Sequence, residues 1–147
     1  MNENEKIKDF LTKYKKITVV GLSSKPERSS YGVTNYLINN RYEIDAVNPN
    51  ETQVLSQPIY NNISEVPHQL EIVNVFRAPQ HIPQLIDELI PLKPKVIWLQ
   101  EGITSPEAEE KARQAGIEVV SDRCIYKAHK SLIKDQIMHQ QVFIPAV

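Results

Sequence analysis

Residues 17–37 read ITVVGLSSKPERSSYGVTNYL, and this stretch decides the fold. The run ITVVG at 17–21 is apolar and rich in β-branched residues, which is typical of a strand covered on both faces. After a polar loop, Val33 and Leu37 recur at helical spacing, and Asn39-Asn40 ends the pattern. The stretch therefore predicts a strand, a loop and a helix, the unit from which α/β sheets are built.

Strand-like and helix-like segments alternate along the rest of the chain. Ile7, Phe10, Leu11 and Tyr14 lie at helical spacing and predict an N-terminal helix over residues 2–15. Further helices are expected from Pro79 to about residue 90, from Ser105-Pro106-Glu107 to Gly116, and over 122–132. Four more strands are predicted at 42–47 (YEIDAV), 71–76 (EIVNVF), 95–99 (KVIWL) and 117–121 (IEVVS). The segment 48–70 is irregular and is expected to contain one short helical turn.

This alternation predicts a doubly wound, three-layer α/β fold of the Rossmann-like kind. Strands joined through helices make right-handed crossovers and a parallel sheet. The simplest order for five strands is 3-2-1-4-5, with a switch point between the first and fourth strands. Ligands of such sheets bind at the carboxyl ends of the strands. The loops expected to form a site are therefore 21–30, 48–50, 76–78 and 100–105.

Length and composition narrow the class of protein. We expect a single domain over residues 1–147, with the helix 2–15 and the tail 134–147 as extensions. Lys and Arg total 17 and Asp and Glu total 18, and this balance gives no indication of a nucleic-acid partner. No apolar run predicts a membrane span or a secretory signal. A single cysteine fits a reducing, cytoplasmic compartment. The sequence identifies no protein partner.

The first loop lacks the fingerprint of a dinucleotide site. In the pattern G-x-G-x-x-G, Gly21 fills the first position, but Ser23 and Pro26 occupy the other two. NAD-binding folds also place an acid at the end of the second strand, where this chain has Val47-Asn48-Pro49. Asp45 lies too early and is interpreted as a solvent-facing carboxylate. Both observations argue against NAD.

The same loop nevertheless has the composition of an anion site. A helix that begins at Ser29 or Ser30 would offer free N–H groups to a phosphate. Hydroxyl groups and two cations add to these donors; they belong to Ser23, Ser24, Ser30, Lys25 and Arg28. A plain solvated turn remains the alternative on composition alone, and the position of the loop in the sheet favours the ligand site.

Five blocks of the sequence resemble a known family. In chain order they are VVGLSSKPERSSYGVTNYL, AVNPN, EIVNVFRAP, VIWLQEGI and VVSDRC. They are similar to the stand-alone CoA-binding domains, Rossmann-like proteins related to the CoA-binding domain of the succinyl-CoA synthetase α-subunit. The resemblance extends over residues 15–133.

The resemblance implies a nucleotide-binding protein whose ligand is coenzyme A or an acyl-CoA. It implies phosphate contacts by Gly21, Ser23, Ser24, Lys25 and Arg28, with Ser30 and Tyr31 at the helix entrance. Asn48 and Pro49 would contact the adenosine part, and Phe76 and Arg77 would supply an apolar ring and a cation. Gln100, Gly102 and Ile103 would lie beside the first loop. Two or three cations suit a ligand with a diphosphate and a 3′-phosphate.

An enzymatic activity is less favoured than binding. Succinyl-CoA synthetase carries its phosphorylated histidine on a further domain, so the resemblance transfers no ligase activity. The sequence has no H-E-x-x-H pair and no G-x-S-x-G elbow, and we assign no catalytic residue and no metal ligand. Glu101 is a candidate general base, but its negative charge is explained equally well as compensation of a helix dipole. The alternatives are an NAD(P)- or other nucleotide-dependent enzyme and an interaction subunit with a vestigial site.

Two further side chains have two interpretations each. Cys124 follows the fifth strand, beside Arg123 and a helix start, where a thiolate is favoured and could form a mixed disulfide with CoA. The alternative, which the sequence favours, is a small buried apolar residue. Tyr31 either faces the ligand or packs against the sheet.

Trp98 is predicted in the core, and His68 and His81 are predicted at the surface.

Overall fold

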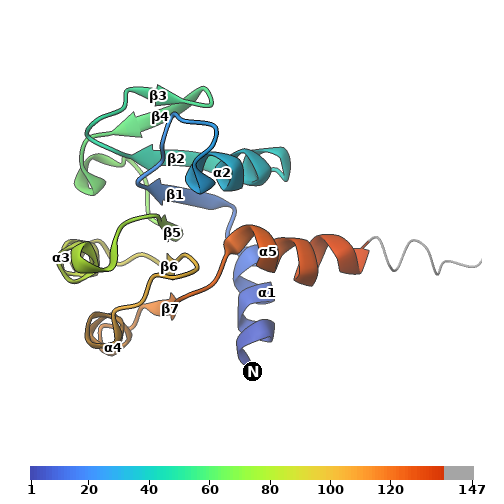
Figure 1. The fold of residues 1–147 in the computed structure, drawn as a ribbon. Coiled ribbons are helices and arrows are strands. Elements are labelled where there is room, and N and C mark those ends of the chain that lie inside the picture. The colour runs from blue at the N-terminus through green and yellow to red at the C-terminus, as the bar shows by residue number, and fades with distance from the viewer. Residues whose placement is uncertain (138–147) are drawn as a thin grey trace, which may run out of the picture.

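A seven-stranded sheet forms the centre of the protein in the computed structural model, which describes residues 1–137 (Figure 1). Its order is β3-β4-β2-β1-β5-β6-β7, and the β3–β4 pair is antiparallel while the other pairs are parallel. The strands are β1 Lys16–Val20, β2 Glu43–Val47, β3 Gln53–Val54, β4 Gln57–Tyr60, β5 Ile72–Val75, β6 Val96–Leu99 and β7 Glu118–Val120.

Helices cover both faces of this sheet, as expected for a doubly wound fold. They are α1 Glu3–Lys13, α2 Ser29–Asn39, α3 Ile82–Leu89, α4 Pro106–Gln114 and α5 Ile125–His129, which continues as a π-helix over Lys130–Lys134. One apolar core joins the sheet to α1, α2 and α5, and a second joins it to α3 and α4. Figure 1 shows these two groups on opposite sides of the strands. Trp98 is fully buried in the first core, as predicted.

The predicted strand order 3-2-1-4-5 is wrong. The strand β5, from EIVNVF, lies beside β1, with Ile17 opposite Ile72, and not beside β2. The place beside β2 belongs to β4, from the segment interpreted as irregular. When only the parallel strands are numbered in chain order, β4 is the third of them, and their order in the sheet is 3-2-1-4-5-6. The switch point lies between β1 and β5.

The hairpin of β3 and β4 has no sequence signal, which explains the error. Its two-residue turn is Leu55-Ser56, and both residues have positive φ, 54° and 60°. Such turns usually carry Asn-Gly or Asp-Gly, because these residues tolerate positive φ at low cost. In addition, β4 contains Pro58, which normally argues against a strand. The single turn Ile63–Glu65 is the short helical turn expected in 48–70.

Several helix starts differ from the sequence-based expectation. Neither Ser29 nor Ser30 caps α2; the cap position is Arg28, without a side-chain capping bond. Ser30 Oγ instead accepts a hydrogen bond from the Ser23 backbone at 3.0 Å. Ser105 does precede α4, but its backbone N–H donates to Glu109 Oε2 at 2.7 Å, and its hydroxyl makes no cap.

The predicted bounds of the outer helices also shift. The helix expected from Pro79 begins with a single tight turn over Pro79–His81 before α3, and the helix expected over 122–132 begins at Ile125. The predicted tail 134–147 lies mostly outside the described residues. Within residues 1–137 there is no helix with the length and apolar character needed to cross a bilayer.

Candidate functional site

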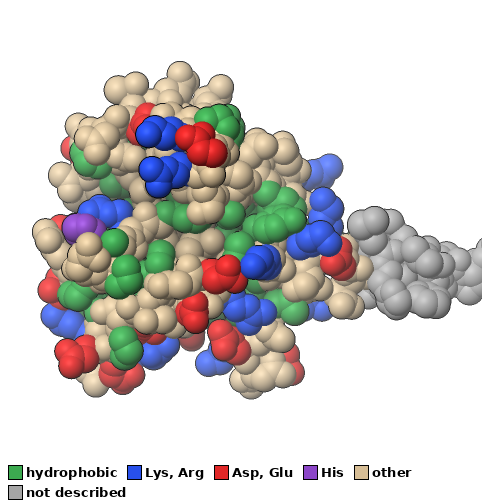
Figure 2. Space-filling view, in the orientation of Figure 1, with side chains coloured by type: hydrophobic (Ala, Val, Ile, Leu, Met, Phe, Trp, Pro, Cys, Tyr) green, Lys and Arg blue, Asp and Glu red, His purple; other side chains and the backbone are tan. Residues whose placement is uncertain are grey.

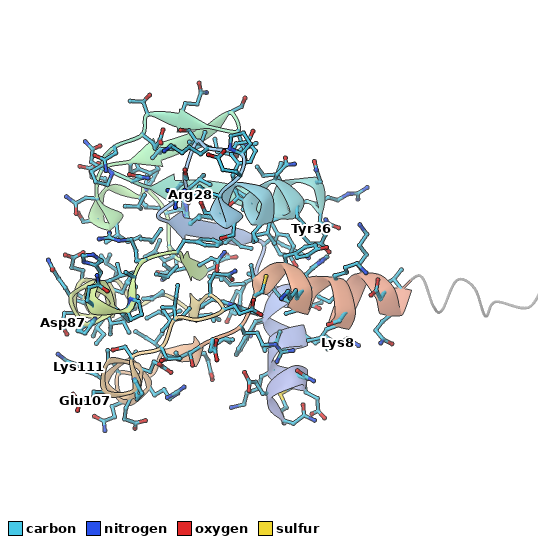
Figure 3. The ribbon with its side chains drawn as sticks, in the orientation of Figure 1. Lys8, Arg28, Tyr36, Asp87, Glu107 and Lys111 are labelled. Atoms are coloured by element: carbon cyan, nitrogen blue, oxygen red, sulfur yellow. The ribbon has the colours of Figure 1, made fainter. Side chains whose placement is uncertain are left out.

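A cavity of about 560 Å³ lies where β1, β5 and β6 end, against the first turn of α2. Figure 2 shows Lys and Arg side chains gathered over the loop between β1 and α2, and Arg28 projects from the start of that helix (Figure 3). The lining residues are Gly21, Ser23, Lys25, Arg28, Ser29, Ser30, Val33, Phe76, Arg77, Ala78, Gln100, Glu101, Ile103 and Cys124.

A second cavity of about 310 Å³ adjoins the first at the ends of β1, β2 and β5. Gly21, Phe76 and Arg77 line both cavities. The other residues of the second cavity are Val47, Asn48, Pro49 and Asn50. Together the two cavities form one continuous surface across the carboxyl ends of four parallel strands, where ligands of doubly wound sheets bind.

Most of the predicted site residues line this surface. Those that do are Gly21, Ser23, Lys25, Arg28, Ser30, Asn48, Pro49, Phe76, Arg77, Gln100, Ile103 and Cys124. Three do not. Ser24 donates to Glu51 from its backbone and its hydroxyl, Tyr31 packs against the core, and the Gly102 backbone donates to Asp122 at 2.7 Å.

Five lining residues were not named individually as site residues, although three of them lie in the predicted loops. Ala78 follows the predicted Phe76-Arg77 pair directly, so the same loop already indicated it. Ser29 was considered only as a helix cap, and Asn50 is the last residue of the AVNPN block. Val33 and Val47 were placed in a predicted helix and a predicted strand; both are buried, and each also contributes to a cavity wall.

Gly21 allows the floor of the site to form. Its φ is +91°, and a Cβ placed on it would lie 2.3 Å from the Phe76 carbonyl oxygen. The Gly21 N–H donates to Val47 at 2.9 Å, while the Phe76 N–H donates to Val20 at 2.9 Å. The three strand ends therefore meet at one backbone position that has no room for a side chain.

Asn48 connects two of the loops. Its Nδ2 donates to the Leu22 carbonyl at 2.8 Å, and its Oδ1 accepts from the Asn50 N–H at 2.9 Å. Beside it, Glu51 Oε1 accepts from the Ser24 hydroxyl at 2.9 Å. Both polar groups of the Asn48 amide are engaged within the protein, so its role in this structure is to hold the loop after β2 against the loop after β1.

The charges around the main cavity are unequally paired. Lys25, Arg28 and Arg77 are exposed, and within residues 1–137 the salt bridges are formed by other side chains. The first N–H groups of α2 have no helical acceptor and add partial positive charge. On the other wall, Glu101 is neutralised by Lys127 at 3.1 Å. The hydrogen bond and charge of Glu101 raise the pKa of Lys127. The cavity is therefore suited to an anion.

The far wall is held by bonds between the loops after β6 and β7. The Ile125 N–H donates to Gln100 Oε1 at 3.0 Å, and Trp98 Nε1 donates to the Arg123 carbonyl at 2.7 Å. Asp122 has a positive φ of 52° and accepts the Gly102 bond described above. These contacts fix Cys124, which lies between Arg123 and Ile125, at the cavity wall.

The structure corrects the interpretation of Asp45. Its carboxylate does not face solvent; the residue is 7% exposed, and it accepts bonds from Thr18 Oγ1 at 2.7 Å and His68 Nε2 at 2.6 Å. His68 Nδ1 lies 2.8 Å from the Gln69 carbonyl. Burial lowers the pKa of His68, but the bonds to Gln69 and Asp45 outweigh burial and raise it above 6.5. Both ring nitrogens then donate, which fixes the segment before β5 to β2.

The His68–Asp45 pair predicts a pH-dependent stability. Because the folded-state pKa of His68 is raised, its contribution should be complete below about pH 6.5 and be lost as the pH rises through the folded value. We expect the free energy of unfolding of the native protein, measured against His68→Gln by urea between pH 5 and 9, to fall by on the order of 1 kcal/mol. His129, whose pKa is lowered by burial, contributes an opposite slope that is common to both proteins.

The exposed His81 provides the control for this experiment. His81→Gln should follow the native curve at every pH, because its side chain takes part in no salt bridge within residues 1–137. Parallel curves for the native protein and His68→Gln would contradict the assignment.

Metal ligation finds no support in the side chains. Among residues 1–137, no three His, Cys, Asp or Glu side chains gather in a way that could hold a metal ion.

Comparisons with known proteins agree with this geometry. The chain is 35% identical over 123 residues to the uncharacterised protein YneT of Bacillus subtilis strain 168, covering 84% of this chain and 91% of that one. A solved structure described as a hypothetical protein from Pyrococcus horikoshii OT3 is 35% identical, with a TM-score of 0.86 over 90% of this chain and 93% of that one.

A more distant likeness concerns the fold alone. The dinucleotide-forming acetyl-coenzyme A synthetase 1 of Candidatus Korarchaeum cryptofilum matches with a TM-score of 0.65 and 19% identity. The match covers 74% of this chain and 26% of the synthetase chain. The family model described as CoA binding domain matches residues 15–130, which contain every lining residue of the two adjoining cavities. The chain therefore belongs to the CoA-binding domain family.

Proposed function

We propose that the protein is a binding module for coenzyme A or an acyl-CoA, held across the carboxyl ends of β1, β2, β5 and β6. One observation carries this proposal: the cavity at the β1–α2 turn has three cations, Lys25, Arg28 and Arg77, without carboxylate partners among residues 1–137. Unpaired cations beside a helix N-terminus form a site for phosphate groups. Membership of the CoA-binding domain family supports CoA as the source of those phosphates.

The parts of CoA match the parts of the surface. The diphosphate would contact the first turn of α2 and the side chains of Lys25 and Arg28. The second cavity, lined by Phe76 and Pro49 among others, suits the adenosine part. Arg77 lines both cavities and would contact a further phosphate. The arm of CoA that carries the thiol would follow the main cavity toward Ile103.

The structure gives less support to an NAD-dependent enzyme. Asp45 is engaged by Thr18 and His68, and it lies within β2 and not at its end. Glu51 follows β2 by four residues, but its Oε1 already accepts two bonds from Ser24. Asp45 is therefore not available to hold a ribose in the way that NAD-binding folds require, and Glu51 is tied through Oε1 to the loop after β1.

Calorimetry with CoA, dephospho-CoA, NAD and NADP tests the proposal. We expect the tightest binding for CoA, and an affinity for dephospho-CoA that is lower by about tenfold, because one charge-assisted contact is lost. A preference for NAD or NADP would favour the nucleotide-dependent enzyme. No binding of any of the four would favour an interaction subunit with a vestigial site. Either result would overturn the proposal.

A further inference from the structure

Cys124 is the single cysteine of the chain, and it lines the main cavity. Its side chain is half-buried and shares the cavity wall with Gln100 and Ile103. The bonds from Trp98 to Arg123 and from Gln100 to Ile125 fix the backbone on both sides of it. Cys124 therefore lines the cavity on a segment held by bonds on both sides, and it also packs against the first core.

Gln100 provides an independent indication of what this end of the cavity holds. The residue is 5% exposed and lines the cavity, and its Oε1 is engaged by the Ile125 N–H. Its Nε2 amino group makes no hydrogen bond with an acceptor in residues 1–137. This amino group, unlike the amide of Asn74, is not among the sealed polar atoms of residues 1–137, and the residue that carries it lines the cavity. A nearly buried donor without a partner indicates a ligand with an acceptor, such as an amide carbonyl.

We infer that this end of the cavity takes the amide-bearing arm of CoA, the part that ends in the sulfur. We also infer that Cys124 reacts with the disulfide form of CoA and forms a mixed disulfide with that sulfur. The inference rests on the proposed function and assigns the orientation of the ligand. Gln100 Nε2 donates to an amide carbonyl of the arm, and Val33 and Ile103 contact its methylene groups. The sulfur at the end of the arm then lies beside Cys124.

The reaction is a thiol–disulfide exchange in which the second substrate is a disulfide of CoA. The Cys124 thiolate attacks one sulfur of CoA disulfide, the S–S bond of that molecule breaks, and a Cys124–CoA disulfide forms. One CoA leaves as a thiolate and takes up the proton that Cys124 lost, so no external oxidant is needed.

The test is the mass of the intact full-length protein, freed of reductant, after incubation with CoA disulfide or with glutathione disulfide. We expect one CoA adduct per chain, formed at least about tenfold faster than the glutathione adduct, because binding places the sulfur beside the thiol. Adenosine 3′,5′-bisphosphate should slow the CoA reaction and leave the glutathione reaction unchanged. Cys124→Ser should form no adduct.

A variant of Gln100 tests the orientation of the arm. Gln100→Glu keeps an acceptor for Ile125 but removes the donor, so the ratio of the CoA rate to the glutathione rate should fall severalfold. The glutathione rate corrects for any change in the thiol itself. Equal rates for the two disulfides in a protein that binds CoA by calorimetry would overturn this inference and leave the proposed function intact. Failure to bind CoA at all would overturn the proposed function.

Discussion

Gly21→Ala is expected to destabilise the protein by roughly 2–4 kcal/mol and to disrupt the site. Gly21 has a φ of +91°, a conformation that costs any other residue about 1–2 kcal/mol. The added Cβ would also lie 2.3 Å from the Phe76 carbonyl oxygen and 3.2 Å from the Phe76 carbonyl carbon. Because these neighbours are backbone atoms of the central sheet, relief requires β1 and β5 to separate at the floor of the cavity.

Gly32→Ala is the matched control for this substitution. Gly32 is exposed on α2, and a Cβ placed on it meets no atom within 4 Å. The change should stabilise the protein by about 0.5–1 kcal/mol, since alanine is the better helix former. Urea unfolding of both variants measures the difference. A Gly21→Ala protein as stable as the native one would show that the close approach of β1 and β5 is not required.

Loss of the two cations of the first loop should have the second large effect. Lys25→Ala and Arg28→Ala are each expected to weaken CoA binding about tenfold, and the double variant about a hundredfold, because each removes a charge-assisted contact. Both side chains are exposed and outside the two cores, so the variants should unfold at the native urea concentration. The salt dependence of binding should weaken in parallel.

Lys8→Ala provides the charge-matched control for these variants. Lys8 lies on α1, away from the cavity lining, as Figure 3 also shows. Its removal changes the net charge by one unit, as Lys25→Ala does, but should leave the calorimetric affinity for CoA unchanged. If Lys25→Ala, Arg28→Ala and Lys8→Ala all bind CoA like the native protein, the loop cations take no part in binding.

The sequence located the loops of the site even though the strand order was wrong. In both the predicted and the observed order β1 is central, so the loop after it reaches the middle of the carboxyl edge. The error concerned the neighbour of β1. Because β5 lies beside β1, Phe76 and Arg77 belong to the centre of the surface and line both cavities.

Other features depend on contacts between distant residues and have no local signal. Asp45 resembles a solvent-facing acid in a strand, and only the fold brings His68 to it from 23 residues away. Asn74 in EIVNVF is fully buried, although its amide has no partner among residues 1–137. A fully apolar strand such as β6 predicts burial on both faces, but that pattern does not indicate which strands are adjacent.

The two edges of the sheet have a consequence for how copies of the chain meet. An unpaired strand edge can template another chain, and long apolar edges promote aggregation. Here the edges are β3, with two residues, and β7, with three. The strands with the most β-branched sequences, such as β1 with KITVV, are paired on both sides. The short hairpin and the short last strand thus keep the β-branched central strands, such as β1, away from a second molecule.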